Sequence, residues 1–212
     1  MIRPEIITYV EKNILPLYDS FDRGHRRDHA QQVIERSAQL ARGFKVNEEM
    51  VYVVAAYHDT GLKYGRKLHH SDSARIIRSD KELERWFTTE QILTIADAAE
   101  DHRASAEHAP RTIYGRIVAE ADRLIIPELI LRRIVQYNLA NYPTLDIEGH
   151  WHRALEHLHE KYAEGGYLRV WIEESDNGEK LRELRKIISN LPLLREMFEK
   201  IYTEECNKKE PI

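Results

Sequence analysis

Apolar residues recur at helical spacing along most of the chain, and short polar or glycine-containing segments separate these stretches. In the run 50–57, Val51, Val54 and Ala55 occupy positions i, i+3 and i+4, which form one face of a helix. Stripes of the same period predict further helices over residues 4–16, 29–43, 72–78, 88–102, 112–126, 128–139, 146–158 and 179–205. Residues 167–172 resemble a strand, but this run is too short and isolated to change the fold class. The pattern therefore predicts an all-α protein.

The apolar run 50–57 leads directly into His58 and Asp59. His58 continues the face of Val51 at i+7, so the helix carries an imidazole in its last turn, next to a carboxylate. We expect Gly61 to end this helix, because glycine tolerates a positive φ. An imidazole nitrogen beside a carboxylate oxygen suits Zn, Mn or Fe. For the pair alone, the simpler interpretation is a buried histidine hydrogen-bonded to its neighbour.

Other ionisable side chains also lie at helix ends or on buried faces. His29 opens a helix after a polar turn, and His25 stands four residues earlier, on the far side of the expected helix start. Asp122 lies beside the apolar stripe of the helix 112–126, where an ionised carboxylate needs either a metal or an ion pair with a nearby arginine. His102 lies on the apolar face of the helix 88–102 and therefore points inward.

Composition and charge narrow the possible functions. A net charge of −4 gives no electrostatic case for a nucleic-acid partner. A single cysteine, Cys206, excludes disulfides within the chain and fits a reducing compartment. The N-terminal residues contain no apolar signal region, and no run approaches the length of a membrane span. We therefore expect a cytoplasmic protein with no membrane partner.

The order His29, then His58-Asp59, then Asp122 resembles the HD-domain superfamily of metal-dependent phosphohydrolases. The short sequence motifs around these residues also fit this family. They are Asp28-His29-Ala30-Gln31-Gln32-Val33, Ala55-Ala56-Tyr57-His58-Asp59-Thr60-Gly61 and Glu120-Ala121-Asp122-Arg123-Leu124. The resemblance covers residues 19–126. It implies a single HD-type helical bundle, with a metal-binding core over residues 1–126 and a C-terminal helical extension over residues 127–212 that packs on this core within the same domain.

The resemblance also implies a ligand set. His29, His58, Asp59 and Asp122 would hold a divalent transition metal, which could be Mn, Fe, Zn, Ni or Co, with Mg possible. Family members with a second ion use extra histidines between the adjacent His-Asp pair (the dyad, here His58-Asp59) and the last aspartate (here Asp122). In this chain those histidines would be His70, or with less support His69, together with His102. We expect one or two ions.

The implied activity is hydrolysis of a small phosphorylated substrate, a nucleotide or another phosphoester. Asp59 would help to position the attacking water, and Lys63 would assist in the catalysis. In the family the motif around the His-Asp pair often ends in Gly-Lys, whereas in this chain Lys63 is displaced by one residue. Basic residues gather near the candidate ligands and favour an anionic substrate; we assign Arg26, Arg27 and His25 to substrate binding. A homodimer is possible.

Two other functions stay open. A minority of HD-like proteins hold two irons and oxidise a small substrate. The histidines between the dyad and Asp122 could be ligands of such a centre, so a di-iron oxygenase is the first alternative. A non-catalytic regulatory module that binds a nucleotide is the other alternative, but such a module has no need of the complete ligand set. The histidines at positions 150, 152, 157 and 159 sit among polar neighbours, which predicts a solvated helix face without a catalytic role.

Overall fold

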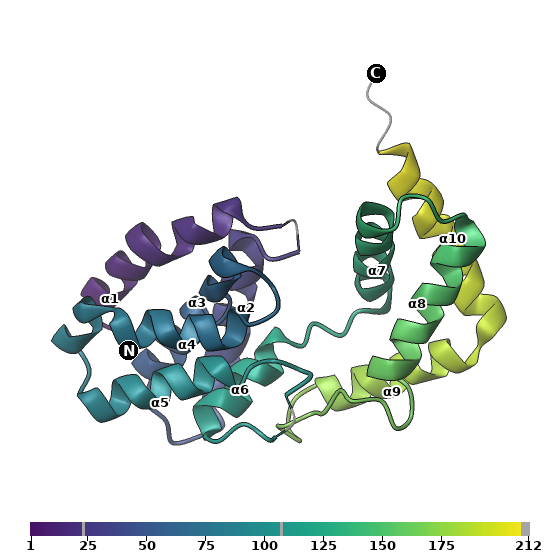
Figure 1. The fold of residues 1–212 in the computed structure, drawn as a ribbon. Helices are drawn as coiled ribbons and strands as arrows, with labels where there is room; N and C mark the ends of the chain where they lie inside the picture. The colour runs from purple at the N-terminus through teal and green to yellow at the C-terminus, as the bar shows by residue number, and fades with distance from the viewer. Residues whose placement is uncertain (23, 107, 209–212) are drawn as a thin grey trace. The chain divides into compact units, whose positions relative to one another are not determined.

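The computed structural model describes residues 1–22, 24–106 and 108–208, and its regular elements within these ranges are all helical, which confirms the all-α prediction. The α-helices are α1 (Pro4–Tyr9), α2 (Arg27–Ala41), α3 (Glu48–Tyr57), α4 (His69–Ser79), α5 (Thr89–Glu100), α6 (Ile113–Asp122), α7 (Pro127–Asn141), α8 (Ile147–Lys161), α9 (Asn177–Ser189) and α10 (Leu191–Asn207) (Figure 1). Shorter helical segments are η1 (Val10–Ile14), η2 (Leu15–Ser20), η3 (Thr60–Tyr64) and η4 (Lys81–Arg85). None of the described helices is long and apolar enough to cross a membrane.

Side-chain caps mark the N-termini of α3 and α5, the helices that precede His58-Asp59 and His102. Asn47 caps α3, and its side chain accepts hydrogen bonds from the backbone N–H groups of Glu49 and Met50. Thr88 and Gln91 form a reciprocal capping box at the start of α5. Both caps are hydrogen bonds within one turn of the helix end, so they depend on local sequence alone.

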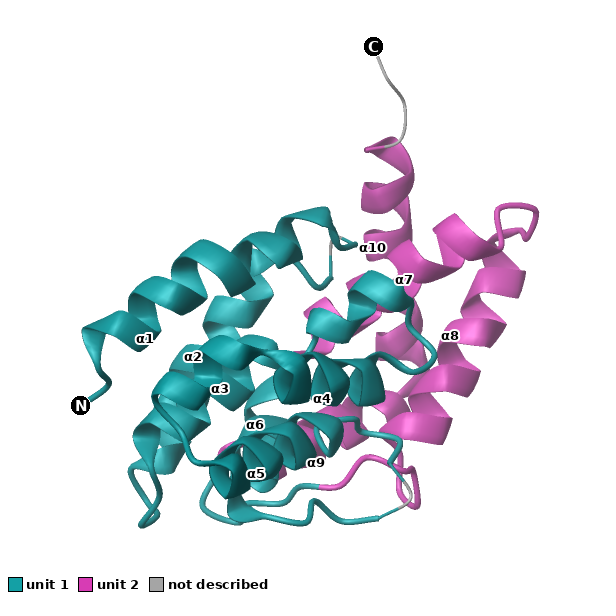
Figure 2. Ribbon diagram, turned by 60° about the vertical axis from the view of Figure 1, so that its left-hand side comes forward, with its two compact units in different colours: residues 1–123, 170–175 teal, residues 124–169, 176–212 magenta. Residues whose placement is uncertain are grey.

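The chain divides into two compact units (Figure 2). Unit 1 contains residues 1–123 and 170–175, and unit 2 contains residues 124–169 and 176–212. The expected boundary at residue 126 lies close to the first division, but the return of residues 170–175 to unit 1 was not expected. The single-domain organisation, with the C-terminal helices packed on the core, stays a prediction.

In unit 1, α3 packs against α2, α5 and α6. Residues 53–57 of α3 have no exposed surface, so this helix is buried on all sides near its C-terminal end. A helix that is apolar around its whole circumference must be covered on every face. The last turn of α3 therefore holds the next residues, His58 and Asp59, inside the unit.

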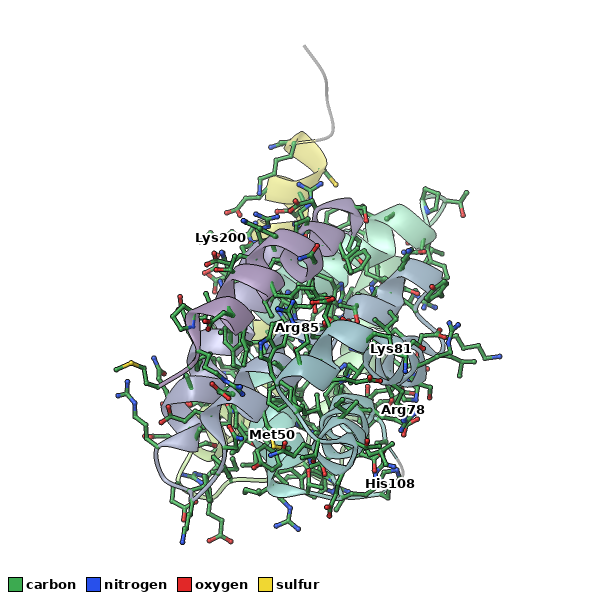
Figure 3. The ribbon with its side chains drawn as sticks, turned by 90° about the vertical axis from the view of Figure 1, so that its left-hand side faces the viewer. Met50, Arg78, Lys81, Arg85, His108 and Lys200 are labelled. Carbon is green, nitrogen blue, oxygen red and sulfur yellow. The ribbon has the colours of Figure 1, made fainter. Side chains whose placement is uncertain are left out.

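Basic side chains of α4 and η4 extend at the surface of unit 1, where Figure 3 labels Arg78, Lys81 and Arg85. Each of them pairs with a carboxylate: Arg78 with Asp97 at 2.8 Å, Lys81 with Glu84 at 2.7 Å, and Arg85 with Glu82 at 2.8 Å. This face is therefore a mixture of both charges.

The run 167–172 forms no strand in the part of the chain that the structure describes. The backbone N–H of Trp171 donates instead to the Oε2 atom of Glu120 at 2.7 Å, and the Ser175 hydroxyl donates to its Oε1 atom at 2.6 Å. Ile172 packs into an apolar cluster with Val51 and Ile117. The buried Glu120 carboxylate thus accepts the hydrogen bond from the Trp171 backbone N–H, which in a sheet would go to a neighbouring strand.

In unit 2, α7 packs against α8 and α10. The prediction of a solvated histidine face on α8 is wrong for His150, which is buried with its ring 5.5 Å from the Tyr202 ring. His152 and His159 are exposed, and His157 is half-buried. The polar residues near His150 in the sequence lie on other faces of α8. The polar composition of this segment therefore led to the wrong expectation that His150 is exposed.

Candidate metal centre

Helix ends position the ionisable side chains that converge in unit 1. His58 is the residue that follows α3, and Asp59 comes directly after it. His29 lies in the first turn of α2, Asp122 is the last residue of α6, and His102 follows α5 by two residues. Side chains at helix ends can point toward one centre while the helices themselves pack around it.

The first group joins His29, His58 and Asp59, all of them buried. The Nε2 atoms of His29 and His58 are 3.2 Å apart, and they lie 3.5 and 3.3 Å from the Oδ2 atom of Asp59. The Oδ1 atom of Asp122 lies 3.2 Å from the His29 Nε2 atom and 3.9 Å from that of His58. The four expected ligands therefore meet in one place.

A second group shares Asp59 with the first and adds His69 and His102. The Oδ1 atom of Asp59 lies 3.5 Å from the Nε2 atom of His69 and 3.3 Å from that of His102, and these two nitrogen atoms are 3.3 Å apart. Asp59 thus presents one carboxylate oxygen to each group. The arrangement offers positions for one or two cations around a shared carboxylate.

Backbone carbonyl groups orient three of the imidazoles. The Nδ1 atoms of His58, His69 and His102 donate to the carbonyl oxygens of Ala55 at 2.8 Å, Arg66 at 2.8 Å and Ala99 at 2.5 Å. With the proton on Nδ1, the Nε2 lone pair of each ring faces the centre. Ring nitrogens of this kind, held by a hydrogen bond on the other nitrogen, are typical metal ligands.

The donor set fits a divalent metal. Nε2 lone pairs 3.2–3.3 Å apart repel each other unless a proton or a cation lies between them. Imidazole nitrogens combined with carboxylate oxygens are the ligands that Zn, Fe, Mn, Ni and Co accept in proteins. The cluster of His29, His58 and Asp59 and the cluster of Asp59, His69 and His102 could each hold a metal ion.

The protonation equilibria show how strongly the groups interact. Burial lowers the pKa of His29, but hydrogen bonds and charge from Asp122 and Asp59 outweigh it and raise the pKa to about 9. Burial raises the pKa of the Asp59 and Asp122 carboxyls, but the surrounding histidines hold both pKa values well below the usual range. Burial and the charge of His102 lower the pKa of His69 to about 4. The carboxylates are therefore ionised and ready to bind a cation.

The structure places His69, and not His70, beside His102 and Asp59. The sequence favoured His70 and predicted that the next helix begins at residue 72, but α4 begins at His69. Successive residues on a helix point about 100° apart, so one of two neighbours faces the centre and the other does not. Burial and the charge of Arg103 lower the pKa of the His70 imidazole.

Gly61 has a different role from the one expected. Positive φ occurs, among the described residues, at Gly65 and Gly165 and not at Gly61. A Cβ atom at Gly61 would lie 1.9 Å from the His69 carbonyl oxygen and 2.6 Å from the Ser73 nitrogen. The Gly61 N–H also donates to the Ser73 hydroxyl at 2.9 Å. The glycine therefore allows the turn after the dyad to approach the first turn of α4, which carries His69.

Of the residues assigned to substrate binding, His25 lies against the centre, with its ring 5.8 Å from the His29 ring and its Nδ1 atom 2.8 Å from Asp22. Arg26 is exposed, and Arg27 pairs with Asp19 at 3.0 Å. The neighbouring Arg23 lies outside the described residues.

Lys63, which the resemblance placed in the chemistry, is exposed on η3, and its Nζ atom lies 5.8 Å from the centre of the Tyr64 ring. No charged partner of Lys63 is among the described ion pairs. A direct catalytic role for Lys63 stays a prediction.

Part of the chain matches a known protein family. Residues 26–125 match the family model described as HD domain. These residues form an HD domain. The resemblance seen in the sequence is therefore confirmed, and the four expected ligands, His29, His58, Asp59 and Asp122, all fall within the matched range. No curated protein matches the chain significantly.

One solved structure shows similarity to the chain. It is a predicted HD superfamily hydrolase from an uncultured Thermotogales bacterium, with 20% sequence identity and a TM-score of 0.49. The match covers 72% of this chain and 82% of that protein.

Proposed function

We propose that this HD domain is a metal-dependent phosphohydrolase that acts on a nucleotide or another small phosphoester. The observation that supports it is the shared carboxylate: Asp59 is buried between two groups of imidazoles whose Nε2 atoms all face the same centre. His29, His58, Asp59 and Asp122 would hold one ion, and His69 and His102 would join Asp59 around a second. A divalent ion held there would polarise a phosphoryl oxygen and lower the pKa of a bound water.

The residues around the ligands support an anionic substrate. The side chain of Asp122 is 28% exposed whereas that of His58 has no exposed surface, so the centre opens toward solvent on the Asp122 side. His25 lies next to His29, and its Nδ1–H is held by Asp22. A ring fixed through Nδ1 leaves Nε2 available to contact a phosphate oxygen. Arg26 and Arg66 lie on the exposed segments that precede α2 and α4 and would add positive charge.

The experiment combines metal analysis with a substrate screen. Purified protein is analysed for Mn, Fe, Co, Ni and Zn, and phosphate release is measured with nucleoside mono-, di- and triphosphates and with bis(p-nitrophenyl) phosphate. We expect a bound transition metal and metal-dependent hydrolysis of at least one compound. His58→Ala combined with Asp59→Ala should abolish both. His152→Ala, which removes an exposed histidine of unit 2, is the matched control and should change neither.

The outcomes separate the alternatives. Full metal occupancy in the double variant would contradict the ligand assignment. The second group of ligands also supports a di-iron oxygenase, which would be recognised by two equivalents of iron and substrate-dependent oxygen consumption without phosphate release. Stable metal binding without turnover of any compound would favour a non-catalytic nucleotide-binding module.

A further inference from the structure

The end of α3 depends on side chains to satisfy its last carbonyl groups. The carbonyl oxygens of Ala55, Ala56 and Tyr57 accept hydrogen bonds from the His58 ring, the Tyr18 hydroxyl and the Thr60 hydroxyl at 2.8, 2.9 and 2.8 Å. A helix end leaves such carbonyls without helical partners, so other donors must supply them. The His58 and Thr60 donors are local, whereas the Tyr18 donor comes from 38 residues earlier in the chain.

The same hydroxyl also binds the dyad itself. The backbone N–H of Asp59 donates to the Tyr18 oxygen at 3.2 Å. One phenol oxygen therefore donates to the last turn of α3 and accepts from the residue that both metal groups share. This pair of bonds fixes the backbone of Asp59 relative to the axis of α3.

The Tyr18 ring is held rigidly enough to transmit this constraint. Tyr18 lies on η2 and has no exposed surface. Its ring centre lies 5.3 Å from that of Phe21 and 6.3 Å from that of His58. A buried phenol between two aromatic neighbours has little rotational freedom. Tyr18 also precedes the matched HD range, so the family match gives it no role.

We propose that Tyr18 is a positioning residue for the metal centre: its hydroxyl holds the backbone at Ala56 and Asp59 so that the Asp59 carboxylate presents one oxygen to each group of histidines. The proposal rests on the proposed function only in assuming that the centre binds a metal. The Asp59 carboxylate bridges atoms only 3.3–3.5 Å away on both sides, so a small rotation of its backbone would weaken one group while it strengthened the other.

The test uses Tyr18→Phe, which keeps the buried ring and removes the hydroxyl. The matched control is Tyr57→Phe. Tyr57 is also fully buried and directly precedes His58, but its hydroxyl donates to Asp80 at 2.5 Å and makes no contact with the dyad. Both variants lose one buried hydroxyl and should melt at a lower temperature. A purely structural role of Tyr18 would therefore make the two variants behave alike at the metal centre.

The decisive readout is the visible spectrum and affinity of Co(II) added to the metal-free protein. We expect Tyr18→Phe to shift the cobalt bands and to weaken Co(II) binding by about tenfold to a hundredfold, the range typical of groups that orient metal ligands. Tyr57→Phe should keep the wild-type bands and affinity. Wild-type cobalt behaviour in Tyr18→Phe, or the same change in both variants, would overturn the proposal.

Two additions make the result unambiguous. If Tyr18→Phe does not fold, 3-fluorotyrosine at position 18 keeps the ring and hydroxyl but weakens the oxygen as an acceptor; shifted cobalt bands support the proposal, and unchanged bands overturn it. The cobalt readout does not require turnover, so a wild-type protein that binds Co(II) but hydrolyses nothing would contradict the proposed function and leave the role of Tyr18 intact. A wild-type protein that binds no Co(II) would overturn both.

Discussion

Gly61→Ala tests whether close packing behind the dyad builds the metal centre. The added Cβ atom would lie 1.9 Å from the His69 carbonyl oxygen, and an ordinary contact begins at 3.4 Å. The first turn of α4 would therefore have to move by about 1.5 Å. The contacts at 1.9 and 2.6 Å involve backbone atoms of residues 69 and 73, so rotating a side chain cannot relieve them.

The expected cost follows from the geometry. Overpacking a core costs about 1–3 kcal/mol, and a backbone clash belongs at the upper end of this range. For a chain of this length each kcal/mol lowers the melting temperature by about 2–4 °C, so Gly61→Ala should melt about 6–12 °C below wild type. A displacement of about 1.5 Å also exceeds the tolerance of roughly 0.5 Å for a working site. We expect hydrolysis to fall by about a hundredfold or more.

The assay compares thermal unfolding, metal content and hydrolysis in Gly61→Ala and in a control, Gly178→Ala. A Cβ atom at Gly178 would meet only the Arg182 Nη1 atom, at 3.8 Å, and this glycine lies in the first turn of α9. Because alanine favours a helix more than glycine does, the control should melt at or slightly above the wild-type temperature. The reasoning is refuted if Gly61→Ala melts within about 2 °C of wild type and keeps its metal and activity.

Two further predictions concern the second metal group and unit 2. His69→Ala should remove one equivalent of metal or reduce hydrolysis by at least tenfold, whereas His70→Ala should have a much smaller effect; equal losses in elemental analysis would contradict the assignment. In unit 2, burial raises the pKa of Glu205, but hydrogen bonds from Lys208, Gln136 and Arg132 outweigh it and lower the pKa from 4.5 to about 2. This stabilisation is present above pH 4.5 and is lost as the pH falls toward 2. Unfolding curves of Glu205→Gln should therefore lose this pH dependence, while Glu204→Gln, at a more exposed partner of Arg132, should keep it.

Much of the fold and of the first metal group could be predicted from the sequence, because the signals are local. Asn47 and the Thr88–Gln91 pair cap their helices through hydrogen bonds within one turn. His58 and Asp59 are adjacent in the chain, and helical periodicity alone places the imidazole on the apolar face of α3. Each candidate ligand of the first group stands at a helix end that such patterns can locate.

Features that depend on contacts between residues more than one helical turn apart were decided by tertiary packing. The residue before α4, Leu68, makes no capping hydrogen bond through its side chain, so no local signal marked the start of this helix at His69. At Gly61 the absence of a side chain lets the backbone after His58-Asp59 approach the backbone of α4 at His69 and Ser73. In this arrangement His69 lies beside Asp59 and His102. In the same way the burial of His150 and the hydrogen bonds of Tyr18 depend on neighbours far away in the chain, which sequence periodicity cannot identify.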